Sequence, residues 1–271
     1  MNYKDEIKVC AFDFDGTLID FNYNVTEYTK TALRKLSENG YKVALATGRP
    51  SFMGLKGFRK AMGDIHIDYV LGCNGSEIMD VNKNETNIMF PLSAEDVRYI
   101  GKVLDSEYIA LGIYDGEQFL VNKPVDSPEL IEWMNARWIT PKLFDYSTND
   151  KPRSKVIVIN EKKNREKEIE FLKTVDLSRV NGFFSSPYCF EIAPKGVSKA
   201  TSCEYLCKLL NCNMNQILSF GDNDNDMPML LATTGVIMEN ARDELKAQIP
   251  LHTDRVDGLG IYDFLSRNGL I

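Results

Sequence analysis

Histidine is scarce in this sequence and cysteine is scattered, and both facts limit the metal sites that the chain can form. The 271 residues include only two histidines, His66 and His252. The six cysteines, at positions 10, 73, 189, 203, 207 and 212, include no CxxC pair. Structural zinc sites are built from closely spaced cysteine and histidine ligands. The sequence therefore does not favour a zinc site, and we interpret the cysteines mainly as buried core residues.

The sequence also lacks an excess of basic residues and any long apolar run. Its 39 acidic and 32 basic residues give a formal net charge of −7 at pH 7, which provides no general attraction to nucleic acid or an anionic membrane. The N-terminal segment MNYKDEIKVC carries charges where a signal peptide would be apolar, and no run could span a bilayer. We therefore expect a cytoplasmic monomer or weak homodimer with no nucleic-acid or membrane partner.

What is present is a series of short, continuous apolar runs separated by helical patterns. Such runs begin at Val9 and occupy residues 44–46, 69–73, 217–220 and 236–238. Strands that are buried on both faces of a parallel sheet have this composition, whereas half-exposed strands alternate apolar and polar residues. The pattern predicts an α/β fold with a doubly wound, Rossmann-like parallel sheet.

The middle of the chain has a different pattern. A polar stretch, NKNET, at residues 82–86 is interpreted as a linker. Beyond it the sequence predicts helices that begin near Ser93 and Ser127 and a hairpin that turns at Asp115 and Gly116. We therefore predict an inserted α+β domain at residues 83–187 and a single core domain formed by residues 1–82 and 188–271.

Polar residues follow three of the predicted core strands: Asp13 and Asp15, Thr47 and Gly48, and Gly221 and Asp222. Ligands of an open parallel sheet bind at the carboxyl ends of its strands. Ordinary turn formation explains one such strand end but has to be assumed separately for each. Carboxylates gathered at one edge cannot all stay ionised without a cation, and oxygen ligands favour a hard divalent ion such as Mg²⁺.

A magnesium site of this kind is typically completed by the phosphate of a substrate. Asp13 is ionised at neutral pH and could attack phosphorus without a base to activate it. Asp15 projects to the same side of an extended chain and could protonate the leaving group. Thr47 and one lysine would hold the remaining phosphoryl oxygens.

With these residues the sequence resembles the haloacid dehalogenase (HAD) superfamily of phosphohydrolases, and specifically its Cof-type branch, subclass IIB, which has a large α/β cap of the C2B type. The four motifs of the family occur in order as DFDGT, ATGR, GVSKA and GDNDND. They extend from Asp13 to Asp226, so the resemblance covers most of the chain, and their ordered combination is far more specific than any single motif.

The resemblance implies roles for the acidic residues. Asp13 would be the nucleophile that forms an aspartyl phosphate, and Asp15 would be the general acid and base. Mg²⁺ would be held by the carboxylates of Asp13 and Asp222 and by the backbone carbonyl of Asp15. Asp226 would support the metal without binding it directly.

The resemblance also implies a phosphate-binding set. Its members would be the backbone at Phe14, together with Thr47, Gly48, Lys199 and Asn225. Lys195 lies close to Lys199 in the sequence, and only the motif spacing selects Lys199. Ala200 follows the lysine where many relatives have glycine, which does not put the lysine in doubt. Arg49, in the second motif, would either bind the substrate or form a salt bridge.

The sequence thus predicts a magnesium-dependent phosphatase that hydrolyses small phosphorylated metabolites, such as sugar phosphates, with the inserted cap selecting the substrate. Two alternatives remain at this point. A phosphomutase would use the same intermediate and return the phosphoryl group to its substrate. A regulator that binds metal and phosphate without turnover would have no reason to keep Asp15.

Overall fold

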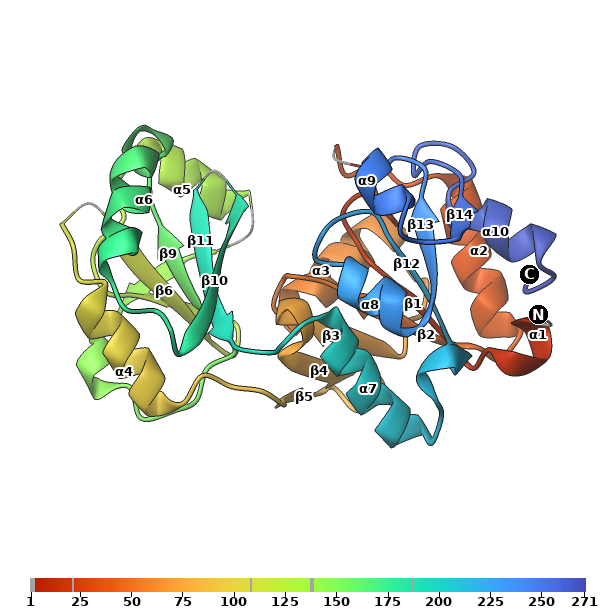
Figure 1. Ribbon diagram of the computed structural model, residues 1–271, viewed down its shortest axis with the longest axis horizontal. Coiled ribbons are helices and arrows are strands. Elements are labelled where there is room, and N and C mark those ends of the chain that lie inside the picture. Colours follow the sequence, from red (N-terminus) through yellow and green to blue (C-terminus); the bar gives the residue numbers. More distant parts are fainter. Residues whose placement is uncertain (1–2, 21, 108, 137–138, 187) are drawn as a thin grey trace. The chain divides into compact units, whose positions relative to one another are not determined.

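The computed structural model describes residues 3–20, 22–107, 109–136, 139–186 and 188–271, which form two compact units (Figure 1). The core unit consists of the described residues of Met1–Met89 and Val197–Ile271, and the inserted unit consists of those of Phe90–Gly196. A doubly wound α/β core with an inserted α+β unit is the fold that the sequence predicts, and that prediction is confirmed.

The core unit is built on an eight-stranded sheet with the strand order β14-β13-β12-β1-β2-β3-β4-β5. The strands are β1 (Val9–Phe12), β2 (Lys42–Ala46), β3 (Tyr69–Gly72), β4 (Glu77–Asp80), β5 (Glu85–Ile88), β12 (Ile217–Gly221), β13 (Thr234–Met238) and β14 (Leu251–Thr253). The six strands from β14 to β3 run parallel, and β4 and β5 add an antiparallel hairpin at one edge. The first strand lies in the middle, between β12 and β2, so that its carboxyl end is surrounded by other strand ends.

Helices cover both faces of the core sheet. The helices are α1 (Tyr3–Glu6), α2 (Glu27–Glu38), α3 (Ser51–Met62), α7 (Lys199–Leu210), α8 (Met227–Ala232), α9 (Asp243–Lys246) and α10 (Ile261–Arg267). Apolar residues of α2, α3 and α10 pack with Phe12 and Phe220 on one face, and Leu206 of α7 and Met229 of α8 pack with Ala11 on the other. Both faces of the central strands are therefore buried, which explains their continuous apolar sequences.

The start of α7 is fixed by local hydrogen bonds. The backbone N–H of Ser198 donates to Oγ1 of Thr201 at 3.3 Å, and that hydroxyl donates to the carbonyl of Ser198 at 2.7 Å. This link closes the first turn of the helix on the residue that precedes it. As a result Lys199 is the first residue of α7.

The boundaries of the inserted unit differ from the predicted residues 83–187. The expected linker at residues 82–86 is instead the turn and the beginning of β5, because Oδ1 of Asp80 accepts hydrogen bonds from the backbone N–H groups of Asn82 and Lys83, both at 3.1 Å. Strand β5 lies at the sheet edge with all four residues exposed, so its polar sequence looks like a linker. At the other end, β11 (Cys189–Pro194) pairs with β9 (Val156–Ile159) and belongs to the inserted unit.

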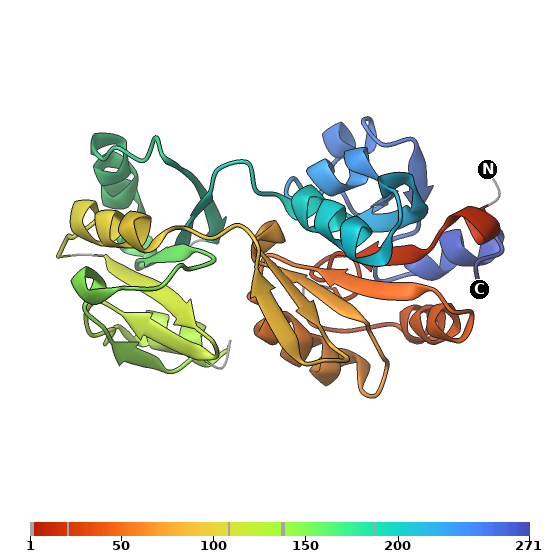
Figure 2. The same ribbon diagram turned by 90° about the horizontal axis from the view of Figure 1, so that it is seen from below.

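The inserted unit has a six-stranded sheet with the order β10-β11-β9-β6-β7-β8. Its other elements are α4 (Ala94–Val103), β6 (Ala110–Asp115), β7 (Gln118–Val121), α5 (Pro128–Asn135), β8 (Pro141–Leu143), α6 (Arg165–Thr174) and β10 (Val180–Ser186). Helices α4 and α6 lie on the same side of the sheet (Figure 2). Val97 and Ile100 of α4 pack with Leu111 and Ile113 of β6. The predicted hairpin at Asp115 is confirmed as the β6–β7 pair.

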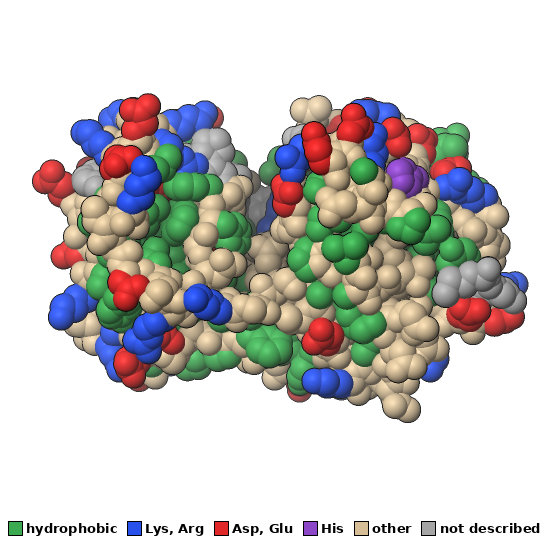
Figure 3. Space-filling view, viewed as in Figure 1, with side chains coloured by type: hydrophobic (Ala, Val, Ile, Leu, Met, Phe, Trp, Pro, Cys, Tyr) green, Lys and Arg blue, Asp and Glu red, His purple; other side chains and the backbone are tan. Residues whose placement is uncertain are grey.

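Acidic and basic side chains are interspersed on the visible face of each unit, without a large patch of one sign (Figure 3). Across the described residues, no helix combines the length and the apolar character that crossing a membrane requires.

Candidate active site

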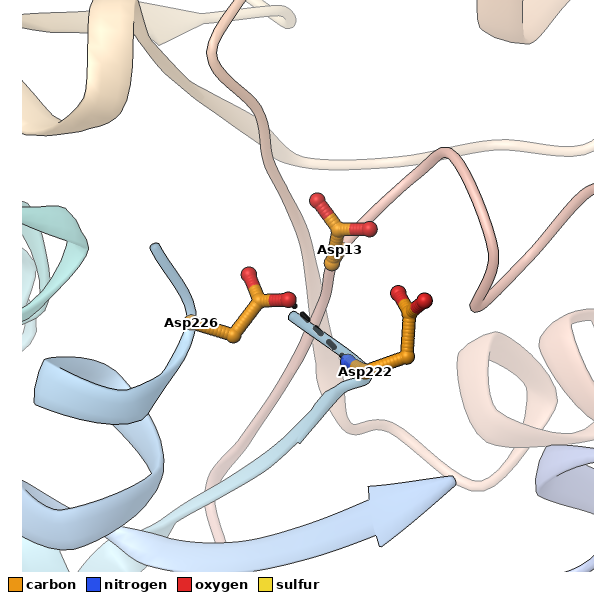
Figure 4. A group of neighbouring side chains, drawn as sticks. All are labelled: Asp13, Asp222 and Asp226. Atoms are coloured by element: carbon orange, nitrogen blue, oxygen red, sulfur yellow. Dashed lines mark hydrogen bonds between the residues drawn. The ribbon is translucent and has the colours of Figure 1, made fainter. Parts of the chain in front are cut away.

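Three buried carboxylates meet at the carboxyl ends of β1 and β12 (Figure 4). Asp13 directly follows β1, Asp222 directly follows β12, and Asp226 lies at the end of the same acidic loop. One oxygen from each carboxylate lies within 4.8 Å of the other two. The ammonium group of Lys199, whose side chain is 0% exposed, donates hydrogen bonds to Oδ1 of Asp13 and to Oδ1 of Asp226. Lys195, by contrast, is exposed.

Asp226 uses both of its oxygens inside the protein. Its Oδ1 accepts from Nζ of Lys199 at 2.6 Å, and its Oδ2 accepts from the backbone N–H groups of Asp222 and Asn223, both at 3.0 Å. It therefore fixes the lysine and the acidic loop at the same time. Both Asp226 oxygens therefore accept hydrogen bonds within the protein.

Asp222 is held close to the turn that follows Asp13. Its Oδ1 accepts from the hydroxyl of Thr17 at 3.2 Å, and its Oδ2 lies 3.5 Å from Nδ2 of Asn240, which also donates to the carbonyl of Gly16 at 2.9 Å. Gly16 has φ +96°, and a Cβ at this position would lie 2.4 Å from Oδ2 of Asp222. Only glycine allows the two segments to approach this closely.

The buried charges are not balanced by the protein alone. Burial raises the pKa of Asp13 above its usual range, and the charges of Asp226 and Asp222 raise it further, while Lys199 opposes them. Burial and then Asp226 raise the pKa of Asp222 to about 7. Burial by itself would lower the pKa of Lys199, but Asp13 and Asp226 raise it above its usual value. Three carboxylates face one ammonium group, so the donor set suits a divalent cation with oxygen ligands.

Asp15 lies outside this trio and is paired with Arg49. The Nε and Nη2 nitrogens of Arg49 donate to the two oxygens of Asp15 at 3.2 and 2.6 Å, so the contact is bidentate. The guanidinium also lies over the rings of Phe14 and Tyr23, 5.1 and 5.7 Å from their centroids. Of the two roles left open for Arg49, the structure shows the salt bridge.

The remaining predicted residues lie around the turn after β3. Oγ1 of Thr47, which is buried, accepts from the N–H of Arg49 at 3.2 Å, and the carbonyl of Thr47 accepts from the N–H of Asn74 at 3.1 Å. Asn225 is exposed, and its Nδ2 donates to Oδ1 of Asn74 at 3.1 Å. Gly48 lies against the same side chain, because a Cβ there would be 3.2 Å from the amide of Asn74.

Two residues in this network, Asn74 and Asn240, are absent from the sequence-based set. Asn74 belongs to an Asn-Gly pair that the sequence marks as a turn, and Asn240 follows β13. Both lie just after strands of the parallel sheet. Ligands of a parallel sheet bind at the carboxyl ends of its strands, and a search of these ends for amide side chains as well as carboxylates would have identified both residues.

Sequence comparisons relate the whole chain to phosphatases. The model of the haloacid dehalogenase-like hydrolase family matches residues 10–265. A protein from Buchnera aphidicola subsp. Schizaphis graminum named "Putative phosphatase" is 26% identical over 96% of this chain and 95% of its own length. An HMP-PP phosphatase from Cronobacter sakazakii is 27% identical over 89% of this chain and 87% of its own length.

Solved structures show the same relationship. A phosphatase of the HAD superfamily from Bacteroides thetaiotaomicron, BT1666, superposes with a TM-score of 0.77 at 25% identity and covers 98% of this chain and 96% of its own. A subclass IIB sugar phosphatase, BT4131, has the same fold, with a TM-score of 0.77 at 22% identity over 97% of this chain and 100% of its own. The chain therefore belongs to the haloacid dehalogenase-like hydrolase family, and it is an enzyme of the phosphatase type.

Proposed function

We propose that the protein is a magnesium-dependent phosphatase that hydrolyses small phosphorylated metabolites through an aspartyl phosphate on Asp13. The observation that supports this most directly is the buried contact between Lys199 and Asp13, with Asp222 beside it. An acid that is buried beside a lysine and two further carboxylates is costly to the fold, and such arrangements are concentrated at functional sites.

The first step is the attack of Asp13 on phosphorus. A bond forms between an oxygen of Asp13 and phosphorus, the bond from phosphorus to the leaving oxygen breaks, and Asp15 gives that oxygen a proton. In the second step Asp15 removes a proton from a water molecule, whose oxygen attacks the same phosphorus. The phosphorus bond to Asp13 breaks, inorganic phosphate leaves, and Asp13 is restored.

Asp13 and Asp222 would hold the magnesium ion, with the carbonyl of Asp15 as the further protein ligand. When bound, the ion supplies positive charge that offsets the charge of the phosphoryl oxygens and of the two carboxylates. Asp226 would keep Asp222 and Lys199 in place through the hydrogen bonds described above. Lys199 would neutralise part of the phosphoryl charge.

We propose that the segments that follow β1, β2 and β12 make the remaining contacts with the phosphoryl oxygens. They comprise the backbone at Phe14, the hydroxyl of Thr47, the backbone at Gly48 and the side chain of Asn225. Thr47 is 1% exposed and its oxygen accepts from the N–H of Arg49, so its position is well defined. A rigid hydroxyl of this kind costs little entropy when it binds an oxyanion.

The substrate is proposed only as a class. Sugar phosphates are the first candidates, in keeping with the resemblance to subclass IIB, and HMP-PP is included because one relative is named for it. We further propose that the inserted unit selects among substrates. A cytoplasmic location, a monomeric or weakly dimeric state and the lack of nucleic-acid partners stay predictions.

Phosphate release tests the proposal. Purified protein is incubated with sugar phosphates, HMP-PP, nucleotides, pyridoxal phosphate and p-nitrophenyl phosphate, with magnesium or with chelator, and inorganic phosphate is measured. We expect magnesium-dependent release that Asp13→Asn abolishes while its far-UV circular dichroism stays unchanged. Near wild-type turnover by Asp13→Asn would refute the role of Asp13 as the nucleophile. Transfer of the phosphoryl group back to a sugar phosphate, without release of inorganic phosphate, would indicate a phosphomutase.

A further inference from the structure

The turn after β3, Cys73–Gly75 (η1), has an unusual backbone. Its three residues have φ angles of +51°, +52° and +109°. The left-handed region is rarely occupied by residues other than glycine, although asparagine tolerates it better than most. Two non-glycine residues in succession therefore mark a turn whose shape is imposed by what surrounds it.

The turn is tied to the loop that carries Thr47 and Gly48. The N–H of Cys73 donates to the carbonyl of Arg49 at 2.8 Å, and the N–H of Asn74 donates to the carbonyl of Thr47 at 3.1 Å. The amide group of Asn74 lies against Gly48, where an added Cβ would be 3.2 Å from both Nδ2 and Oδ1. The conformation of one loop therefore depends on the other.

The same turn contacts two further segments that carry proposed phosphate ligands. Oδ1 of Asn74 accepts from Nδ2 of Asn225, a residue of the acidic loop, at 3.1 Å. A Cβ on Gly75 would lie 1.9 Å from the carbonyl oxygen of Ser198, the residue before Lys199. Asn74 and its neighbours thus connect the segments of Thr47, Asn225 and Lys199, which lie far apart in the sequence.

We propose that Asn74 is a positioning residue of the phosphoryl site, which holds Asn225 through its Oδ1 and the Thr47–Gly48 loop through its backbone N–H. Asn225 is exposed, and the contact with Asn74 restricts its rotation. This inference rests on the proposed function, because it concerns the groups that would bind the phosphoryl oxygens.

A double-mutant cycle on oxyanion binding tests the inference. The variants are Asn74→Gly, which suits the positive φ but removes the amide, Asn225→Ala, and both together. Inhibition constants for orthovanadate and for inorganic phosphate are measured with p-nitrophenyl phosphate as substrate, together with kcat and KM. We expect each single change to weaken oxyanion binding about tenfold, and the double change to weaken it no further, because one hydrogen bond is lost in each case.

Asn74→Asp is the conservative control, because it keeps an acceptor oxygen for Asn225. In the Asn74→Asp background, Asn225→Ala should still weaken vanadate binding about tenfold. This second cycle also applies if Asn74→Gly does not fold. Three outcomes would each overturn the inference. The first is that the effects of the two changes multiply in the double variant, and the second is that the inhibition constant for vanadate is unchanged in Asn74→Gly. The third is that Asn225→Ala does not alter vanadate binding in the Asn74→Asp background.

The wild-type protein separates the two hypotheses. If it releases no phosphate from any ester, the proposed function fails, and titration calorimetry with orthovanadate and magnesium still measures the coupling between Asn74 and Asn225. If the wild type turns over and the cycle shows no coupling, only the inference about Asn74 fails.

Discussion

Arg49 binds Asp15 through two hydrogen bonds, and its guanidinium also lies over the rings of Phe14 and Tyr23. The planar fork of arginine matches the two oxygens of a carboxylate, so the contact fixes the direction of the Asp15 side chain as well as its charge. The side chain of Asp15 is 42% exposed, and without this contact we expect it to be mobile.

Arg49→Met should therefore impair the protonation of the leaving group. We expect kcat/KM to fall about tenfold for an alkyl phosphate, which corresponds to about 1.4 kcal/mol in the barrier. The decrease should be much smaller for p-nitrophenyl phosphate, whose leaving group needs no proton. Asp15→Asn is measured for comparison, because it removes the proton donor itself. Equal decreases in kcat/KM of Arg49→Met for the two esters would contradict the role of Arg49 in positioning Asp15.

Lys199→Met should destabilise the protein strongly. Lys199 is fully buried between Asp13 and Asp226, and its removal leaves buried carboxylates without their counter-charge. Losing one partner of such a cluster costs about 3–5 kcal/mol. The decrease is measured by urea unfolding in the presence of chelator. Lys195→Met, at an exposed lysine nearby in the sequence, should stay within about 0.5 kcal/mol of the wild type, and a comparable loss there would contradict this explanation.

Metal affinity should increase with pH up to about pH 7. The pKa of Asp222 is raised to about 7 in the metal-free protein, so the folded state holds a proton that the unfolded chain has already released. A raised acid pKa means that the metal-free protein loses stability as the pH increases from about 4 to about 7. Magnesium has to displace this proton, so stabilisation by magnesium should grow over the same interval.

Thermal unfolding with magnesium or with chelator, at half-unit steps from pH 5 to pH 8, measures this effect. Titration calorimetry in buffers of different ionisation enthalpy reports the released proton directly. Asp222→Asn should remove the contribution of Asp222 to the pH dependence of the metal-free protein, while the raised pKa of Asp13 leaves a remainder. A stabilisation by magnesium that is constant from pH 5 to pH 8 would contradict the prediction.

Gly16→Ala should weaken metal binding by displacing Asp222. The Cβ would lie 2.4 Å from Oδ2 of Asp222, and the backbone at φ +96° is already unfavourable for alanine. Gly40→Ala is a matched control, because Gly40 has φ +85° and no atom within 4 Å of an added Cβ. Both variants should lose about 1–2 kcal/mol of stability from the backbone. Only Gly16→Ala should also bind magnesium more weakly, as measured by calorimetry. Equal magnesium affinities in the two variants would contradict the explanation that the added Cβ displaces Asp222.

The positions of the main strands and the residues of the four motifs are readable from the sequence because both are local properties. A strand buried on both faces is a continuous apolar run, and the polar residues that follow it must lie at its carboxyl end. Asp13 and Asp222 come together for this reason, without any knowledge of the side chains between them.

Features that depend on contacts between distant segments became clear only from the structure. Strand β5 has a polar, exposed sequence, so only its pairing with β4 places residues 85–88 in the core sheet. The end of the inserted unit differs from the prediction for the same reason, because β11 joins that unit through its pairing with β9.

The sequence by itself determined the fold class, the family and the acids at the strand ends, since apolar runs and motif order are properties of the chain. The tertiary structure decided the links around those acids. Lys199 bonds to Asp13 across 186 residues, and Asn225 bonds to Asn74 across 151. Such pairings follow from how the sheet brings strand ends together, and no local pattern encodes which side chains then lie within hydrogen-bonding distance.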